Sequence, residues 1–163
     1  MSDVSHVHLT PIGHVRSPFT SKVGVPIQTA AAQDVSGEVV LLPQFSAGLK
    51  DLDQFEYIIL LTHLHLGTDE SLEVVPFLDT VPRGVFATRS PNRPNRIGMS
   101  VIRLLSISGH AIAFSGNDML DGTPVLDIKP YVPAFDVRHT SRIGWFSKNL
   151  DQLPGKLSDG RMG

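Results

Sequence analysis

The chain has 163 residues, a formal net charge of −2 and a pI near 6.4, which is long enough to bury the core of one domain. This charge argues against a general nucleic-acid coat protein, and the absence of cysteine excludes disulfides, thiolate chemistry and cysteine-ligated metals. No apolar run is long enough to cross a membrane and the first residues lack a signal pattern, so we expect a cytoplasmic protein.

Short apolar segments separated by glycine and proline predict β-strands along most of the chain. The expected strands are residues 8–17, 37–42, 55–66, 84–88, 99–105 and 125–131, with 100–108 and 111–115 forming a hairpin. Residues 21–33 are expected to form a loop, 48–54 a turn or short helix, and 68–82 a polar connection. In the third strand we expect His63 and His65 on one face and Leu64 and Leu66 on the other.

No segment has the period of a long amphipathic helix, and the chain contains no internal repeat or low-complexity stretch. Many short strands with glycine and proline between them favour an all-β sandwich or small barrel in a single domain. Beyond Pro133 we expect one amphipathic patch at residues 143–150 and then a mobile end.

The most distinctive stretch is residues 83–103, RGVFATRSPNRPNRIGMSVIR, which carries five arginines and no acidic residue. Pro91 and Pro94 exclude a helix there, so the arginines are expected on a stiff loop between two strands. Guanidinium groups on such a loop suggest recognition of anionic or planar groups. The alternative is a solvated basic loop with no ligand.

Several common sites are not supported by the sequence. No G-x-G-x-x-G or P-loop is present, and no G-x-S-x-G accompanies the serines. His6-x-His8 and His63-x-His65 could each place two imidazoles together, but no regular set of further ligands completes a metal site, so we predict none. Asp127 and Lys129 should share one strand face, where an exposed ion pair is the simplest reading.

Four blocks together resemble the TrmO family, also called TsaA-like or YaeB-like. They are IGHVRSPF (12–19), VPIQ (25–28), GVFATRSPNRPNRIGMS (84–100) and DMLDGTPVLDIKPYVP (118–133), so the similarity covers about residues 12–136 in unchanged order. The resemblance implies a compact β-barrel rather than a Rossmann fold, over residues 1–136, followed by a tail, 137–163, that is partly helical or mobile. It also implies a homodimeric, S-adenosylmethionine-dependent methyltransferase acting on the exocyclic amino group of threonylcarbamoyl-modified adenosine beside the tRNA anticodon.

Carried over by motif, the resemblance assigns cofactor contacts to Pro26, Ile27, Gln28, His65, Leu66, Arg89, Met99, Leu120, Asp121, Gly122 and Thr123. Arg89 would pair with the cofactor's carboxylate, and apolar side chains such as Leu66 and Met99 would hold its adenine ring. Asp121 or His65 is expected to accept the proton of the amine. Contacts to anticodon-loop phosphates, or to the acidic threonyl group, are expected from Arg93, Arg96, Arg103 and Lys129.

The sequence departs from the family pattern in three places. Arg96 stands where NPIG usually has proline, Leu66 stands where glutamine often follows the histidine, and the additional C-terminal domain of some bacterial members does not follow. Two alternatives therefore stay open: methylation of another RNA or of a small molecule, and a non-catalytic regulator that binds cofactor or RNA.

Overall fold

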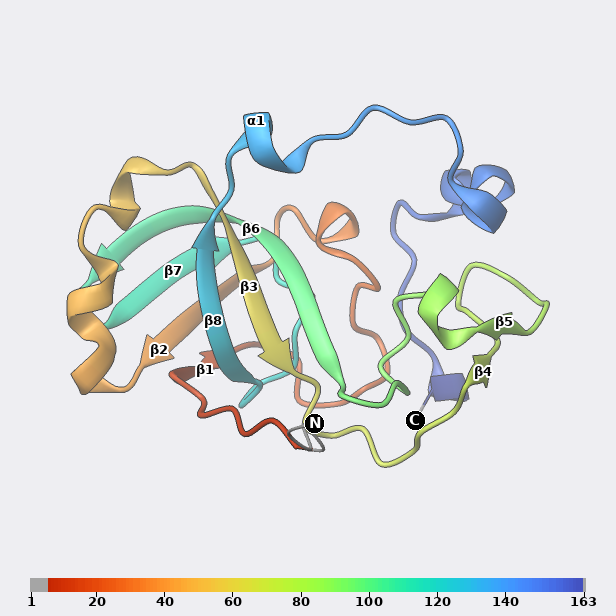
Figure 1. The fold of residues 1–163 in the computed structure, drawn as a ribbon, viewed down its shortest axis with the longest axis horizontal. Coiled ribbons are helices and arrows are strands. Elements are labelled where there is room, and N and C mark those ends of the chain that lie inside the picture. Colours follow the sequence, from red (N-terminus) through yellow and green to blue (C-terminus); the bar gives the residue numbers. More distant parts are fainter. Residues whose placement is uncertain (1–5, 163) are drawn as a thin grey trace, which may run out of the picture.

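The computed structural model describes residues 6–162, and most of its regular structure is a closed antiparallel β-barrel (Figure 1). The barrel strands are β1 (Gly13–Arg16), β2 (Ser36–Leu41), β3 (Tyr57–His63), β6 (Ile97–Ser108), β7 (Ala111–Ser115) and β8 (Pro124–Pro130). Around the barrel they follow the order β1-β2-β7-β6-β3-β8, and β8 pairs back onto β1. The all-β barrel with short helices confirms the predicted fold class.

The strands form where apolar and polar residues alternate, since successive side chains point to opposite faces. In β3, Ile58, Leu60 and Thr62 are buried inside the barrel, and the residues between them are more exposed. The hairpin between β6 and β7 turns at Gly109, whose φ of 60° lies in the left-handed region that favours glycine. The predicted hairpin is therefore present.

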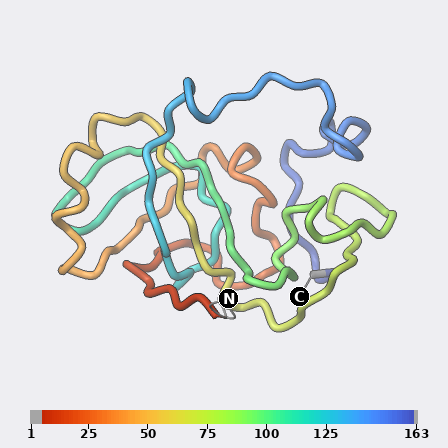
Figure 2. Tube along the Cα trace, viewed as in Figure 1, coloured from red at the N-terminus to blue at the C-terminus, as the bar shows by residue number. Residues whose placement is uncertain are grey.

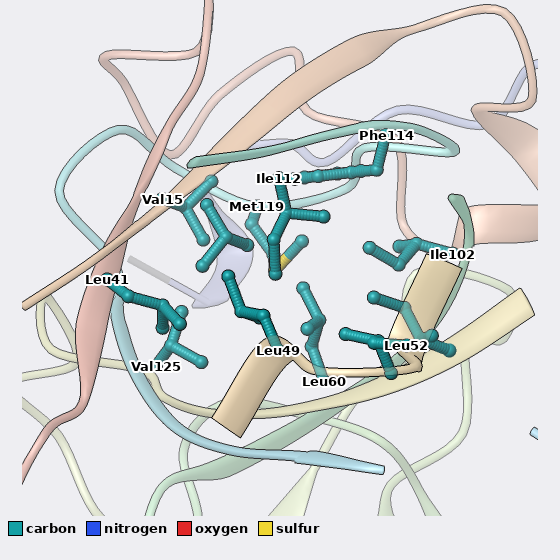
Figure 3. Packing of buried hydrophobic residues seen from close by; sticks show 12 residues of the cluster. Val15, Leu41, Leu49, Leu52, Leu60, Ile102, Ile112, Phe114, Met119 and Val125 are labelled. Carbon is teal, nitrogen blue, oxygen red and sulfur yellow. The ribbon is translucent and has the colours of Figure 1, made fainter. Parts of the chain in front are cut away.

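The barrel interior is a single apolar cluster contributed by every strand (Figure 3). Leu49 and Leu52 join it from η2 (Pro43–Leu49) and η3 (Leu52–Gln54), two short 3₁₀ helices that precede β3. These helices lie at the end of the barrel where β3 begins. The opposite end, where β3 finishes and β6 starts, faces the remaining loops.

Residues 64–96 leave the barrel and form a separate lobe, built on the two-stranded sheet of β4 (Glu73–Val74) and β5 (Arg83–Gly84) (Figure 2). The strand predicted at residues 84–88 is wrong, because the chain there forms the 3₁₀ helix η4 (Val85–Ala87). The amide and the hydroxyl of Thr88 both donate to the carbonyl of Val85, at 3.1 and 2.8 Å, which satisfies the backbone locally instead of in a ladder.

Two other strands are shorter than predicted. Ladder pairing of the first strand is confined to Gly13–Arg16, just after Pro11, which has no N–H to donate. The third strand ends at His63, because the amide of Gly67 donates to the carbonyl of Leu64 and turns the chain. The predicted alternation of His63 to Leu66 on two strand faces is therefore wrong.

The C-terminal segment crosses from the barrel to the lobe (Figure 1). After α1 (Pro133–Asp136) it carries the short 3₁₀ helices η5 (Gly144–Lys148), η6 (Leu150–Gln152) and η7 (Gly160–Met162). The Trp145 indole N–H donates to the carbonyl of Ala87 at 2.8 Å, and the Ser158 amide donates to the carbonyl of Val25 at 2.7 Å. The segment thus packs against both the lobe and the loop around η1 (Thr29–Ala31).

Candidate functional site

A cavity of about 790 Å³ lies at the end of the barrel where β3 finishes. Its walls come from many parts of the chain: the facing ends of β3 and β6, the turn after β3, the 118–123 turn, residues 22–28, residues 76–78 of the lobe, the arginine loop and the C-terminal segment. Its lining is mostly apolar with a few polar groups, and its size falls in the range of small-molecule sites.

Most of the predicted cofactor residues line this cavity although they are far apart in sequence. They are Pro26, Ile27, Gln28, His65, Leu66, Arg89, Met99, Leu120 and Thr123. The barrel gathers them because β3 pairs with both β6 and β8, which brings His65 and Leu66, just after β3, beside the arginine loop and the 118–123 turn.

Asp121 and Gly122 do not line the cavity. Asp121 borders a shallow hollow with Arg16 and Glu38, and its Oδ1 accepts a hydrogen bond from the amide of Ser17 at 2.9 Å. The Asp121 carboxylate therefore links the 118–123 turn to the residues that follow β1 through this hydrogen bond. This placement does not favour Asp121 as the proton acceptor.

The arginine loop directs its side chains to different neighbours. Arg89 lines the cavity, and its Nη1 donates to Oε1 of Gln28 at 3.1 Å, which joins two of the predicted cofactor contacts. Arg93 also lines the cavity, with its Nη1 donating to the carbonyl of Thr88 at 3.0 Å. Arg96 has a φ of 49° and lies against the 64–68 turn, beside Thr68.

Two of the predicted substrate contacts lie away from the cavity on the barrel surface. Arg103 pairs with Glu56 at 3.2 Å, and Lys129 pairs with Asp127 at 2.7 Å. Both pairs are well exposed, so each contributes little to stability. The Asp127–Lys129 pair matches the simple ion-pair reading of the sequence.

His65 is held at the turn after β3, at the cavity wall. Burial first, and then the nearby His63, lowers the pKa of His65 from its ordinary value. A lowered pKa favours the neutral imidazole, which has a lone pair that can accept a proton. Among residues 6–162, no group of three His, Cys, Asp or Glu is arranged to hold a metal ion.

The sequence analysis did not assign several polar residues of the cavity, and three of them form one group. They are Asp118, whose Oδ1 accepts a 2.8 Å hydrogen bond from Ser100 Oγ, and the buried Thr62. Burial raises the pKa of Asp118 to about 6, against the opposing effects of the Ser100 hydroxyl, backbone amides and Arg89. Asp118 begins the DMLDGT motif, but nothing in that spacing distinguished its environment from that of Asp121.

The C-terminal segment also contributes residues that the sequence did not assign to the site. Its lining side chains are Ile143, Trp145, Phe146, Leu150, Leu153, Ser158 and Asp159. The Trp145 and Phe146 rings stack with centroids 3.9 Å apart, and the Arg83 guanidinium lies 5.8 Å from the Trp145 ring. The amphipathic patch expected at residues 143–150 thus turns its apolar side toward the cavity.

Residues 14–137 match the family model of the tRNA-methyltransferase O N-terminal domain. The chain belongs to the TrmO family. It is 50% identical over 151 residues to a probable S-adenosyl-L-methionine-binding protein of Pyrococcus abyssi, covering 93% of this chain and 82% of that protein. A crystal structure of TrmO from P. aeruginosa superposes with a TM-score of 0.75 at 39% identity, covering 90% of this chain and 64% of the other.

The mouse tRNA (adenine(37)-N6)-methyltransferase is 37% identical over 135 residues, which are 77% of this chain but 31% of the mouse protein. The chain thus spans less than two thirds of the solved TrmO chain and about a third of the mouse enzyme. These matches confirm the predicted family, its methyltransferase class and its cofactor, S-adenosylmethionine. In the described part of the chain, no helix is both long and apolar enough to span a membrane.

Proposed function

We propose that this protein transfers a methyl group from S-adenosylmethionine to the exocyclic amino group of threonylcarbamoyl-modified adenosine beside the tRNA anticodon. The observation that carries the proposal is the single cavity in which nine of the predicted cofactor contacts meet. The tRNA (adenine(37)-N6)-methyltransferase names of the mouse and rat relatives support a tRNA adenine as the target. We also propose a homodimer that works in the cytoplasm.

The residues present suit S-adenosylmethionine, which supplies a methyl group already activated on a sulfonium. Leu66, Met99 and Leu120 offer apolar surface for an adenine ring, and Met99 and Leu66 are exposed enough, at 48% and 40%, to be covered by a ligand. The guanidinium of Arg89, which donates a hydrogen bond to Gln28, has further N–H donors that can bind a carboxylate in a bidentate manner.

The chain's own contribution to the transfer is mainly positioning. An activated methyl group needs an amine held in line with it, and fixing two reactants in this way removes much of the entropic barrier. The amine must also lose a proton. His65, neutral at the cavity wall, is the proposed acceptor, directly or through water, in preference to the turn-bound Asp121.

Arg93 and Arg96 are the proposed contacts to the RNA, because they belong to the same loop as Arg89 and carry no ion pair in the described structure. Arg103 and Lys129, on the barrel surface, would reach only more distant phosphates.

The test is methyl transfer from labelled S-adenosylmethionine to total tRNA from cells with and without the threonylcarbamoyl modification. We expect label only in the modified tRNA, and at least a tenfold loss for Arg89→Ala. Arg16→Ala serves as the matched control, because it removes an exposed arginine that pairs with Glu38 outside the cavity, and should keep most of the activity. Equal labelling of the two tRNA pools would refute the proposed substrate.

A further inference from the structure

One acidic group of the cavity lining has no ion-pair partner in the described structure. Asp118 lies beside Ser100, whose hydroxyl donates to its carboxylate at 2.8 Å. The other acid of the lining, Asp159, forms an ion pair with Arg161 at 2.8 Å. Within the described residues no Lys or Arg forms such a pair with Asp118, so its charge faces an apolar cavity without a direct counter-ion.

A second oxygen in the same lining is buried without any hydrogen-bond partner. Thr62 is 1% exposed, and its Oγ1 has no hydrogen-bond partner in the described structure. It lies on β3 opposite Gly98, two residues before Ser100 on β6, and it lines the same cavity. Buried oxygens left without partners are unfavourable, so Thr62 Oγ1, in the same lining as the buried Asp118 carboxylate that lacks a counter-ion, points to a ligand group in this part of the cavity.

The chemistry of the two oxygens selects the kind of ligand. A carboxylate desolvated in an apolar cavity is stabilised by a positive charge nearby, because the interaction is weakly screened there. The pKa of Asp118 is raised to about 6 because burial disfavours its charged form, and the positive charge of Arg89 offsets this effect only in part. Lys22, Arg89 and Arg93 line the same cavity and would by themselves disfavour a cation.

We propose that Asp118 recognises the positive charge of the methyl donor and makes the cavity prefer S-adenosylmethionine over the product S-adenosylhomocysteine. This inference rests on the proposed cofactor but not on the proposed tRNA substrate. The donor carries a sulfonium, an ammonium and a carboxylate, a net charge of +1. The product has lost the sulfonium charge with the methyl group and is neutral overall, so only the donor gains from the buried carboxylate.

The test is calorimetric titration of the free protein with each of the two ligands, without tRNA. For Asp118→Asn at pH 7 we expect at least a tenfold loss of affinity for S-adenosylmethionine and less than a threefold loss for S-adenosylhomocysteine. Asp127→Asn is the control, because it removes a carboxylate that lies outside the cavity lining, and it should change neither affinity. Thermal unfolding of each variant checks that the fold is intact.

The pH dependence gives a second readout. The donor binds the ionised carboxylate, so the wild-type affinity should fall about tenfold from pH 7 to pH 5, with proton release on binding near pH 6. His65 also lines the cavity; burial lowers its pKa from the ordinary value, and its protonation also disfavours a cation. In Asp118→Asn the pH dependence should flatten to the part due to His65.

Three results would overturn the inference. Equal losses for both ligands would mean that Asp118 contacts a group common to them, and unchanged affinities would mean that it has no binding role. Normal binding with lost turnover would place it in the transfer step instead. Each of these is separate from the proposed function, which fails if the wild type binds the donor but labels no modified tRNA.

Discussion

At the scale of single residues, the free protein should be destabilised by the carboxylate that its ligand needs. The folded-state pKa of Asp118, about 6, lies above its ordinary value of 3.8. The folded state therefore binds the proton more tightly, and the contribution of this group to stability falls as the pH rises from about 4 through 6. Asp118→Asn should raise the free energy of unfolding at pH 7.5 by about 1–3 kcal/mol.

Urea denaturation of the wild type and Asp118→Asn at pH 4.5 and 7.5 measures this effect. The increase in the free energy of unfolding caused by Asp118→Asn should be smaller at pH 4.5, where the wild-type carboxyl is protonated in the folded protein. Asn can still accept a hydrogen bond from Ser100, so the substitution changes the charge more than the packing. A gain of equal size at both pH values would show that the charge of Asp118 is not its cause.

The residues that the sequence could assign were those carried by unusual motifs. Arg89, Gln28 and Met99 were assigned from their blocks, and the structure brings all three to one cavity. Asp118 and Asp121 stand three residues apart in one block, and only the fold separates their environments, one beside Ser100 and the other beside Ser17. The burial of each carboxylate depends on which strands pack around it, and the spacing of residues within one motif does not predict this.

At the scale of elements, the alternation of apolar and polar residues predicted strands well where they pair along their length, and poorly where the pairing stops. All six barrel strands fall within or close to their predicted ranges, because alternation and glycine turns act locally. Residues 84–88 look like a strand in composition, yet only Arg83–Gly84 finds a partner strand. The following residues form a 3₁₀ turn instead, because the hydroxyl of Thr88 donates to the carbonyl of Val85, which could otherwise accept a hydrogen bond from a partner strand.

The closure of the barrel depends on a close approach at β1, and Gly13→Ala should disrupt it. Gly13 pairs with both β2 and β8, and an added Cβ would lie 2.8 Å from the Cα of Leu41, with the carbonyl of Val40 also in its way. These are backbone atoms in a ladder, which cannot rotate aside. We expect a loss of about 2–4 kcal/mol in the free energy of unfolding.

Gly84→Ala is the matched control for this prediction, because an added Cβ there has no heavy atom within 4 Å and its φ is −56°. Denaturant unfolding should place the control within about 0.5 kcal/mol of the wild type. Equal stabilities for Gly13→Ala and the wild type would show that β1 can move away from β2 without loss.

At the scale of the whole molecule, the C-terminal segment contributes to the ligand cavity but not to the core that stabilises the barrel. None of its residues that the structure describes belongs to the barrel core cluster, but seven of these line the cavity. Residues 138–142, which connect it to the barrel, are exposed throughout. The sequence indicated a tail that is partly helical or mobile, and could not show its destination because packing between distant segments leaves no local pattern.

Removing residues 138–163 should therefore leave a folded barrel that binds its cofactor weakly. The apolar cluster stays whole, so cooperative unfolding should persist, while the loss of the Trp145 and Phe146 wall should lower the affinity for S-adenosylmethionine at least tenfold. Calorimetry and denaturant unfolding of the shortened chain measure the two properties separately. Unchanged affinity would contradict the role of the segment as a cavity wall.

Trp145 is the only tryptophan in the chain, so its fluorescence reports on this wall in the intact protein. Its indole N–H is held by the carbonyl of Ala87, and its ring lines the cavity, so S-adenosylmethionine should change its emission in a saturable way. The same titration of Asp118→Asn should require at least tenfold more ligand to reach the same change, because the wall is intact there and only the charge is missing. An emission that does not respond to a ligand bound by calorimetry would place that ligand away from the C-terminal segment.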